Sequence, residues 1–459
     1  MTDVDHRAAS EAVTAELVAL VERVVAGARP GEQLEAIAGR STSTRVRAYD
    51  GAVEDLSQAT TGGIGVRVVV DGRQGFASAG SLDPDLVAEA VSEARDNARH
   101  AAVDEANGLA EPDGVPVAEL DLLRPGLAAV PTVDKVALAL ELERRVRAAD
   151  SRVTGVRSAV YADGIGSTAL ATSTGLRVSG ASSSCYLAVQ VLAGDGDETQ
   201  TGHGVSVGRT VADLDLDEAA GDAVDRAVRM LGASKARSQR LTVVLEPSVA
   251  AAFLGIIGGT LSGEAVLKRR SLFADRVGEV VAAPAIALVD DPTDVASLGA
   301  DPHDGEGLAS RRNPLVEDGV LQGYLHNTWS ARRSGASSTA SAVRGIGSTP
   351  GVGPRALALR PGSAQRDELL ASLGDCLVVQ GVSGLHSGVN PVSGDFSVGA
   401  EGVMVRGGAP AEAVREVTIA STLQRMLLDV VAVGAELEWQ PGGTGCPSVA
   451  ISDVSLGGT

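Results

Sequence analysis

The stretch HSGVNPVSGDFSVGAEGVMVRGG, from His386 to Gly408, changes character halfway along its length. Its first half is rich in Gly, Ser, Asn and Pro, which are the usual residues of turns and loops. Its second half, FSVGAEGVMV, alternates in the manner of a β-strand. The stretch therefore predicts a loop that leads into a strand. Two interpretations stay open: the loop is the turn region of a β-hairpin, or it lines a site.

The chemistry of this loop leaves the same choice open. His386 is one of only six histidines and is either a general base or ligand, or a loop residue that bonds to a backbone carbonyl. Asp395 either orients a substrate amine or caps the turn at Gly394. Asn390-Pro391 favours a turn, and Gly388 permits close backbone approach. With Phe396, these six residues form the first candidate site.

Outward from this stretch, the second half of the chain is predicted to be rich in short strands and glycine loops. Residues 240–245 read as a strand, and a helix follows from Pro247, which suits a first helical turn. From 285 to 455 short strands dominate, with helices expected near 365–374 and 410–432.

The first half combines helices with β-hairpins. Apolar spacing predicts helices at 7–26, 83–104, 132–149 and 212–233. Asp50-Gly51 and Asp71-Gly72 each join two short β-type runs, and Asp-Gly supplies the positive φ angles of a two-residue hairpin turn. Helices and strands come in blocks, so the fold class is α+β. Length predicts two domains, 1–230 with a Pro-rich connection near 108–132, and 231–459.

Composition excludes several function classes. The net charge is −20 and aromatic residues make up 2%, so the chain lacks the basic face and stacking residues of a nucleic-acid binder. Cys185, Cys376 and Cys446 have no metal-binding spacing and fit a reducing compartment. The N-terminus does not resemble a signal peptide, and the longest apolar run, 249–259, is about half of the roughly 20 residues that a membrane helix needs. A cytoplasmic protein that binds neither nucleic acid nor membrane is expected.

The segment DPHDGEG, from Asp301 to Gly307, gathers His303, Asp304 and Glu306 within four positions. Carboxylates beside an imidazole serve in zinc sites and as general acid–base pairs. The favoured alternative is a solvated acidic loop. The segment is therefore a secondary candidate site.

Several segments together resemble the TldD/PmbA family, whose members were formerly called modulators of DNA gyrase. The resemblance runs in order along nearly the whole chain. Its most specific part is GVNPVSGDFSVGAEG, and the other parts are GIGVRVVVDGRQGFAS (63–78), LKRRSLFADRVGE (267–279), DGEGLASRRNPLVEDGVLQGYL (304–325) and VAVGAELEWQPGGTGCPSVAISDVSLGG (431–458). The family implies a two-subunit zinc peptidase, TldD with PmbA (TldE), that acts on unfolded or small peptides.

The resemblance also implies that this chain is the subunit without metal. TldD carries a His-Glu-x-x-x-His motif after the strand that corresponds to 240–245. Here LGIIGG stands in its place, with Leu254 and Gly259 at the two histidine positions and Gly255 at the glutamate position. None of these residues binds zinc or transfers a proton. Zinc is thus expected in the partner and none in this chain, and the ligand role is not carried over to Cys446.

The resemblance assigns the opening stretch to a peptide groove, where strand backbone would pair with an extended peptide. Two rival functions remain. One is a self-sufficient homodimeric amide or peptide hydrolase that uses His386 or the DPHDGEG groups, for which a biosynthetic pathway is one setting. The other is a peptide-binding adaptor or gyrase-pathway modulator without catalysis. The sequence identifies neither the substrate nor whether the chain forms a homodimer or a heterodimer.

Overall fold

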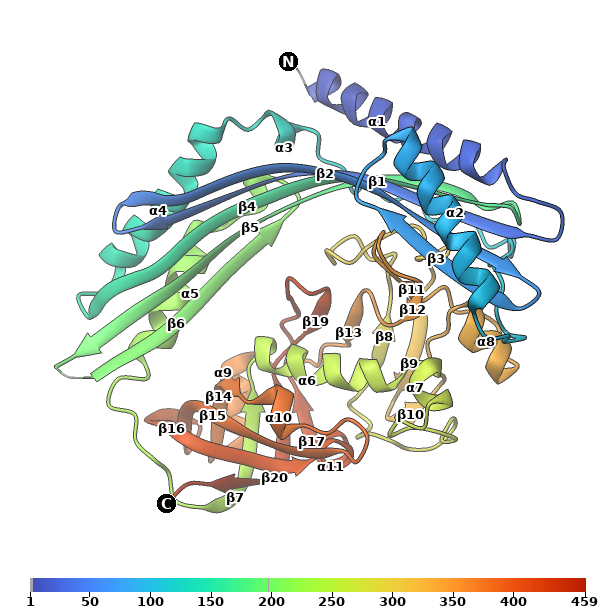
Figure 1. Cartoon of the computed structure of the whole chain (residues 1–459). Coiled ribbons are helices and arrows are strands. Elements are labelled where there is room, and N and C mark those ends of the chain that lie inside the picture. Colours follow the sequence, from blue (N-terminus) through green and yellow to red (C-terminus); the bar gives the residue numbers. More distant parts are fainter. Residues whose placement is uncertain (1–2, 197) are drawn as a thin grey trace.

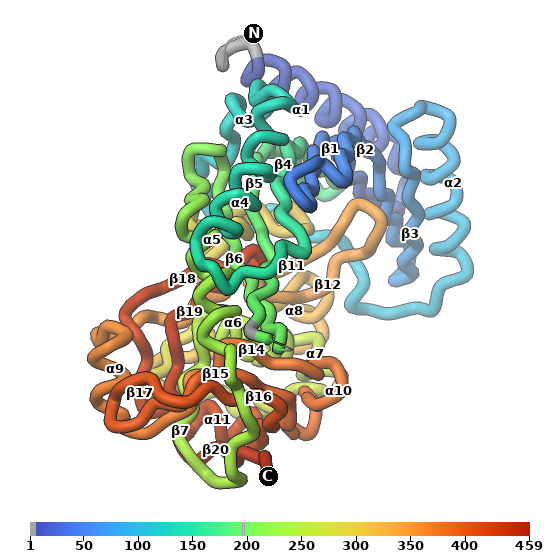
Figure 2. The backbone as a smooth tube through the Cα atoms, turned by 90° about the vertical axis from the view of Figure 1, so that its left-hand side faces the viewer, coloured from blue at the N-terminus to red at the C-terminus, as the bar shows by residue number. Residues whose placement is uncertain are grey.

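The computed structural model describes residues 3–196 and 198–459. A long curved sheet arches across the top of the molecule, and the C-terminal half lies beneath it (Figure 1). The N-terminus lies at the top and the C-terminus at the bottom, and the view turned by 90° shows the same two levels (Figure 2).

The arch is a six-stranded antiparallel sheet in the order β3-β2-β1-β4-β5-β6. Its strands are β1 (Gln33–Tyr49), β2 (Ala52–Val70), β3 (Arg73–Ala79), β4 (Val153–Thr172), β5 (Arg177–Asp195) and β6 (Glu198–Gly208). Several of these strands are far longer than the short runs expected from the sequence, because each continues through Ser-, Thr- and Gly-rich stretches that carry no apolar alternation.

The two Asp-Gly hairpin predictions are confirmed. Asp50 and Gly51 have φ angles of 53° and 75° between β1 and β2, and Asp71 and Gly72 have 49° and 71° between β2 and β3. Positive φ at both central residues matches the twist of the flanking strands. These two turns therefore join the first three strands as hairpins, and a one-residue shift between Arg47 and Ala48 offsets the register of β1 and β2.

Helices cover the sheet in two groups. At one end α1 (Asp3–Val25) and α2 (Pro84–His100) enclose a core with β1 to β4, and at the other α4 (Thr132–Ala149) and α5 (Leu216–Val228) enclose a second core with β1, β4 and β5. The short elements α3 (Gly126–Ala129) and η1 (Val211–Asp213) flank this second group. The connection between α2 and α3 has no long regular element, as expected for the Pro-rich segment.

A second sheet lies in the C-terminal half, in the order β16-β15-β14-β7-β20-β17. A further pairing of β16 with β20 closes five of its strands into a ring. The strands are β7 (Gln239–Leu245), β14 (Cys376–Ser383), β15 (Asp395–Arg406), β16 (Ala409–Thr422), β17 (Val430–Val433) and β20 (Val449–Gly457). Helix α6 (Pro247–Thr260) follows β7 directly, with Pro247 in its first turn, and packs its apolar residues into the largest core.

A third sheet has the order β10-β9-β8-β13-β19-β18. It contains β8 (Leu288–Asp290), β9 (Asn313–Glu317), β10 (Val320–Leu321), β13 (Leu357–Leu359), β18 (Glu438–Trp439) and β19 (Thr444–Cys446). The remaining helices are α7 (Gly263–Leu267), α8 (Thr328–Ser334), α9 (Arg366–Leu373), α10 (Leu385–Gly388) and α11 (Leu423–Leu428).

A two-stranded ribbon of β11 (Ala342–Val343) and β12 (Gly351–Val352) reaches from the C-terminal half to the underside of the arch. Its loop presses against the arch at Gly65, where an added Cβ would lie 2.2 Å from the carbonyl oxygen of Ile346. A side chain at Gly65 would therefore force the ribbon away from the sheet.

The helix expected at 410–432 is wrong, because residues 409–422 form β16 and only 423–428 are helical. The apolar residues Val414 and Val417 mimic helical spacing because the register between β15 and β16 shifts here, and Glu416 takes a positive φ of 53°. A bulge adds one residue to the period-2 alternation, which turns it into an apparent spacing of three.

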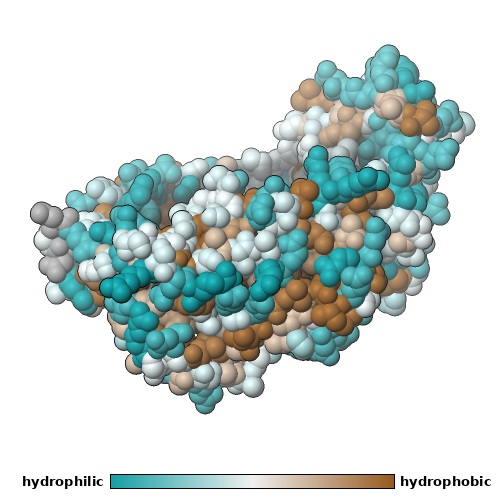
Figure 3. Space-filling view, turned by 90° about the horizontal axis from the view of Figure 1, so that it is seen from below, coloured by the Kyte–Doolittle hydropathy of each residue, from teal (hydrophilic) through white to brown (hydrophobic). Residues whose placement is uncertain are grey.

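Among the described residues, no helix is long and apolar enough to cross a membrane. The underside of the molecule carries hydrophobic residues in small groups between hydrophilic ones (Figure 3). The arch ends at Gly208 and the C-terminal sheets begin at Gln239, and a boundary near residue 230 between two domains stays a proposal.

Candidate functional site

The loop from Leu385 to Phe396 lies at the surface of the ring of strands. His386 sits in the single turn of α10 and is exposed, as are Asn390 and Asp395. The Asn390 side chain accepts hydrogen bonds from the backbone N–H groups of Val392 and Ser393. Asn390 therefore builds the turn, as its sequence context indicates.

Asp395 also bonds within the loop. Its carboxylate accepts a hydrogen bond from the Ser393 hydroxyl at 2.6 Å. Gly394 has a φ of 88°, and a Cβ there would lie 2.0 Å from the Gln424 side chain. Gly388 is similarly close to the backbone of Ser397. The two glycines are thus explained by close packing and by φ, while the outer surface of the loop is free to contact another molecule.

Phe396 belongs to the core and not to this exposed surface. It is 4% exposed, and its ring meets that of Phe253 of α6 edge-on, with centroids 6.2 Å apart. The structure thus brings five of the six candidates together on one loop, and Phe396 anchors that loop from beneath.

The prediction that β15 offers its backbone to a peptide is wrong. β15 pairs with β14 on one edge over Gly399–Val405 and with β16 on the other over Asp395–Arg406. Its main-chain groups are therefore already used by neighbouring strands over most of its length. A peptide that reaches this loop would have to contact side chains and turn backbone.

The three positions that match the metal motif lie on α6. Gly255 and Gly259 are exposed, and a Cβ at either would meet nothing within 4 Å, whereas Leu254 is 2% exposed and packs in the core. In an ideal helix, positions 254 and 259 differ by about 500°, which leaves them roughly 140° apart. Leu254 and Gly259 accordingly face different sides of this helix.

The DPHDGEG segment differs from the solvated loop favoured by its sequence, because Asp304 is 6% exposed and Glu306 is 0% exposed. The Asp304 carboxylate accepts hydrogen bonds from the backbone N–H groups of Glu306, Leu308 and Ala342. Burial, followed by the nearby Glu306 charge, raises the pKa of Asp304 to about 6, although these backbone bonds act in the opposite direction. Asp304 therefore fixes two loops to each other.

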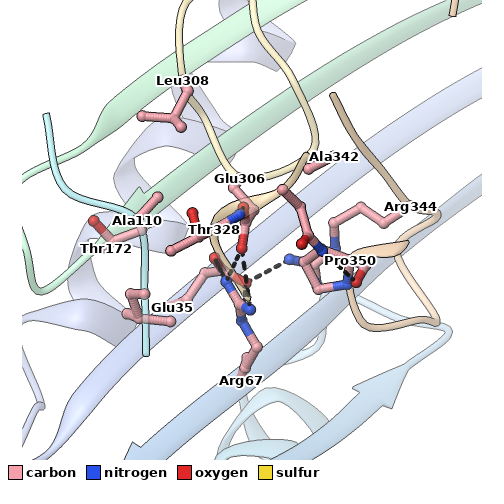
Figure 4. Close-up of polar contacts among 12 residues, drawn as sticks. Glu35, Arg67, Ala110, Thr172, Glu306, Leu308, Thr328, Ala342, Arg344 and Pro350 are labelled. Atoms are coloured by element: carbon pink, nitrogen blue, oxygen red, sulfur yellow. Dashed lines mark hydrogen bonds and ion pairs between the residues drawn. The ribbon is translucent and has the colours of Figure 1, made fainter. Parts of the chain in front are cut away.

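Glu306 belongs to a buried ionic cluster that joins the arch to the C-terminal half (Figure 4). Arg67 of β2 donates to both carboxylate oxygens of Glu35 of β1, at 3.0 and 2.7 Å, and lies 3.4 Å from Glu306. Arg344, from the ribbon loop, pairs with Glu35. Glu306 also accepts the backbone N–H of Thr328 at the start of α8, at 2.8 Å. All four side chains are at most 4% exposed.

A second buried carboxylate joins the two halves at the other end of the arch. Glu246 stands immediately before α6 and is 3% exposed. Its carboxylate pairs with the guanidinium of Arg229, at the end of α5, at 2.9 Å. Arg366 of α9 contacts the same oxygen at 3.0 Å. Buried carboxylates paired with arginines therefore join the two halves at two separate points, although Arg229 and Arg366 at the second point are partly exposed.

A crevice of about 520 Å³ opens between the underside of the arch and the C-terminal loops. Its walls are β4 and β5 on one side and the loops 300–305 and 342–344 on the other. His303 and Asp301 line it, together with Arg355, which donates to the His303 carbonyl and to Ser310. Burial lowers the pKa of His303, so a neutral imidazole faces the crevice at neutral pH.

No three His, Cys, Asp or Glu side chains gather in a metal-binding arrangement within residues 3–196 and 198–459. Cys185, Cys376 and Cys446 are free and buried. Burial raises the pKa of all three thiols, that of Cys185 to about 12, which suppresses the thiolate that binds metals.

Sequence reasoning missed Glu35, Arg67, Arg344 and Glu246. Glu35 and Arg67 face each other across β1 and β2, since Glu35 pairs with Arg67 in the strand register. A one-residue register shift between Arg47 and Ala48 separates this pair from the Asp50-Gly51 turn, so counting back from the turn would have placed Val66 opposite Glu35 and missed the pair. The contact of Arg67 with Glu306, 239 positions away, carries no local signal.

Comparison with known proteins gives a consistent result. Three family models match along the chain: PmbA/TldA metallopeptidase domain 1 over 34–98, the central domain over 125–231 and the C-terminal domain over 238–458. The chain is 27% identical to the metalloprotease PmbA of Escherichia coli O157:H7 over 427 residues, or 92% of each chain.

A metalloprotease TldD homolog of Haemophilus influenzae is also 27% identical, over 445 residues and 89% of each chain. Among solved structures, TldE from Thermococcus kodakarensis superposes with a TM-score of 0.87 at 22% identity, covering 96% of this chain and 99% of that one. That likeness concerns the fold alone.

Proposed function

Because the chain belongs to the PmbA/TldD metallopeptidase family, we propose that it is the non-metal subunit of a heterodimeric zinc peptidase. Its partner is a TldD-type paralogue that carries His-Glu-x-x-x-His. The pair works in the cytoplasm on unfolded or small peptides.

The geometry of α6 carries this proposal. Leu254 is buried in the core, and Gly255 and Gly259 are exposed without side chains that could bind an ion. A zinc site needs His, Cys or carboxylate ligands around one point. The residues of this chain at the motif positions do not fit zinc, so no catalytic step is assigned to a metal on this subunit.

The role that remains is to shape the space around the partner's zinc. The loop with His386, Asn390 and Asp395 is the part of the first candidate site that a bound peptide would meet, since these three residues are exposed. Excluding bulk water from a metal site strengthens the electrostatic interactions inside it.

The rival hydrolase has less support. A catalytic carboxylate must be free to exchange protons with substrate. Asp304 accepts three backbone hydrogen bonds, and Glu306 is paired with Arg67 and Thr328. Asp304 is therefore already used to hold two loops of the C-terminal half together, and Glu306 to join that half to the arch. The gyrase-pathway adaptor gains no support from the charge of the chain, since a net charge of −20 disfavours direct binding to DNA.

Metal content tests the proposal on this chain alone. Purified, washed protein should contain no stoichiometric zinc by elemental analysis. One tightly held zinc per wild-type chain would contradict the non-metal assignment.

A further inference from the structure

A cavity of about 250 Å³ lies on the outer face of the arch, the side of the sheet turned away from the C-terminal half. Its floor is formed by β1 and β4, and its roof by the first half of α1 together with α3, which lie above the sheet (Figure 1). Asp163, Ile165 and Ser167 of β4 line it. Gly166 and Thr168 line the crevice that contains His303. Successive strand residues point to opposite faces, so the cavity and the crevice lie on opposite faces of the sheet.

A buried ion pair lies at this cavity. Lys135, near the start of α4, places its ammonium 2.6 Å from the carboxylate of Asp163, and the two side chains are 7% and 6% exposed. Tyr161 donates to the same carboxylate oxygen at 2.7 Å. Lys135 also donates to the Thr44 hydroxyl of β1 at 3.0 Å. The charge of Asp163 is therefore already compensated by its neighbours.

Two donor groups at the cavity have no acceptor. An ammonium can donate three hydrogen bonds, and within the described part of the chain Lys135 donates two. The hydroxyl oxygen of Ser10, on α1, is buried and has no hydrogen-bond partner among the described residues. Buried polar groups in native proteins are almost always paired. Both groups therefore indicate that an acceptor from outside the chain completes this site.

The charge of the lining selects the kind of acceptor. Lys135 and Asp163 cancel each other, and the other charged residue that lines the cavity is Arg40. Arg40 pairs with Glu16 at 3.3 Å, but the two side chains are 38% and 67% exposed. Exposed pairs of this kind contribute little, so Arg40 can turn to a ligand at low cost. In a chain with a net charge of −20, this local excess of donors and positive charge favours an anion.

The remaining walls are largely apolar. They are formed by small and aliphatic side chains of α1, of α3 with the segment before it, and of β4: Ala9, Val13, Leu123, Leu127, Ala128 and Ile165. Pockets that combine an apolar lining with a few placed polar groups are typical of small-molecule sites. The volume equals that of about eight water molecules at roughly 30 Å³ each, which limits the ligand to about eight non-hydrogen atoms.

We infer that this cavity is a binding site for a small monocarboxylate with an aliphatic body. The carboxylate accepts from the Lys135 ammonium and the Ser10 hydroxyl, Arg40 closes over it, and the aliphatic body packs against the apolar walls. A free aliphatic acid and the C-terminal end of a short peptide both present this chemistry. The site does not rest on the proposed function, because neither the loop with His386 nor the crevice takes part in it.

The test titrates the full chain with hexanoate and follows saturation-transfer NMR, with hexanol and hexylamine as probes of the same chain length. Hexanoate should bind at least about tenfold more tightly than either, because hydrogen bonds to a charged group are the stronger ones. N-acetylalanine distinguishes the two sources. If it binds more tightly than hexanoate, the site takes a peptide end, and if it binds more weakly, the site takes a free acid.

Two variants tie the binding to the cavity. Ala9→Trp fills it from an exposed position of α1 and should weaken hexanoate binding at least about tenfold. Ala8→Trp is the matched control, since Ala8 is exposed and does not line the cavity, and it should bind as wild type does. Lys135→Met with Asp163→Asn removes both charges of the buried pair, so that neither is left alone. This double variant should bind hexanoate no better than hexanol.

Three results would overturn the inference. They are absence of saturation transfer at millimolar hexanoate, equal affinities for wild type and Ala9→Trp, and binding of hexanol or hexylamine as tight as that of hexanoate. Circular dichroism of each variant shows that a loss of binding does not come from unfolding. None of these readouts requires peptidase activity, so a failure here and a failure of the proposed function are distinguishable.

Discussion

Replacing Arg67 with Met should destabilise the whole chain, because Arg67 is the charge that two buried glutamates share. Its guanidinium makes a bidentate pair with Glu35 and lies 3.4 Å from Glu306. After the substitution Glu35 keeps Arg344, but Glu306 keeps only the Thr328 N–H. Removing one partner of a buried ion pair costs about 3–5 kcal/mol, and we expect a loss of unfolding free energy in that range.

The assay is equilibrium unfolding in urea, followed by circular dichroism and by tryptophan fluorescence. Trp329 on α8 is a suitable reporter, since it donates to Asp104 across the two halves at 3.0 Å. Arg99→Met is the matched control, because its pair with Asp96 is 64% and 56% exposed. Exposed pairs contribute about 0–1 kcal/mol, so this variant should unfold close to wild type.

A rescue separates lost charge from lost packing. Arg67→Met with Glu306→Gln removes the stranded charge and should recover much of the stability, since the amide oxygen can still accept the Thr328 N–H. If Arg67→Met unfolds within about 1 kcal/mol of wild type, or if the double variant is no better than the single one, the buried cluster does not hold the arch to the C-terminal half.

Acid should weaken the same cluster. Burial by itself would raise the pKa of Glu35, but Arg67 and Arg344 outweigh it and hold that pKa below its usual value. A carboxylate with a lowered folded pKa contributes stability that is complete above its unfolded pKa and is lost as the pH falls through the folded value. Stability in wild type should therefore fall more steeply below pH 4.5 than in Glu35→Gln.

Three further predictions concern other parts of the molecule. His386→Ala and Asp395→Ala should change the unfolding free energy by less than about 0.5 kcal/mol but should lower peptide turnover by the assembled pair. Phe396→Ala should lower the unfolding free energy by about 3–5 kcal/mol. Equal destabilisation by all three variants would show that the loop is structural. Native chain should leave its three buried cysteines unmodified by a thiol reagent and react at all three after unfolding, as thiol titration will show. In a mobility-shift titration at physiological salt, duplex DNA should remain unbound at micromolar protein, and sub-micromolar, salt-sensitive binding would contradict the charge argument.

Local chemistry made much of the fold predictable. Both Asp-Gly turns, the helix at 132–149 and the strand and helix on either side of Glu246 follow from residues within a few positions. The helix expected at 410–432 failed because a bulge at Glu416 changes the apparent period, which only the partner strand reveals. Strand lengths in the arch were underestimated, since Ser- and Gly-rich residues extend strands only when neighbours supply the ladder.

The candidate site was less predictable, because its geometry depends on long-range contacts. The sequence placed His303, Asp304 and Glu306 together but could not show that two of them are buried against Arg67, Thr328 and Ala342. Burial and strand order must be known before such side chains can be assigned a role.

Peptide cleavage by the mixed subunits tests the central claim most directly. This chain is expressed alone and together with a TldD-type paralogue carrying His-Glu-x-x-x-His, and an unstructured peptide is assayed with and without a zinc chelator. The non-metal assignment predicts no cleavage by this chain alone and chelator-sensitive cleavage by the mixture. Chelator-resistant cleavage by this chain alone would contradict it and favour the self-sufficient hydrolase.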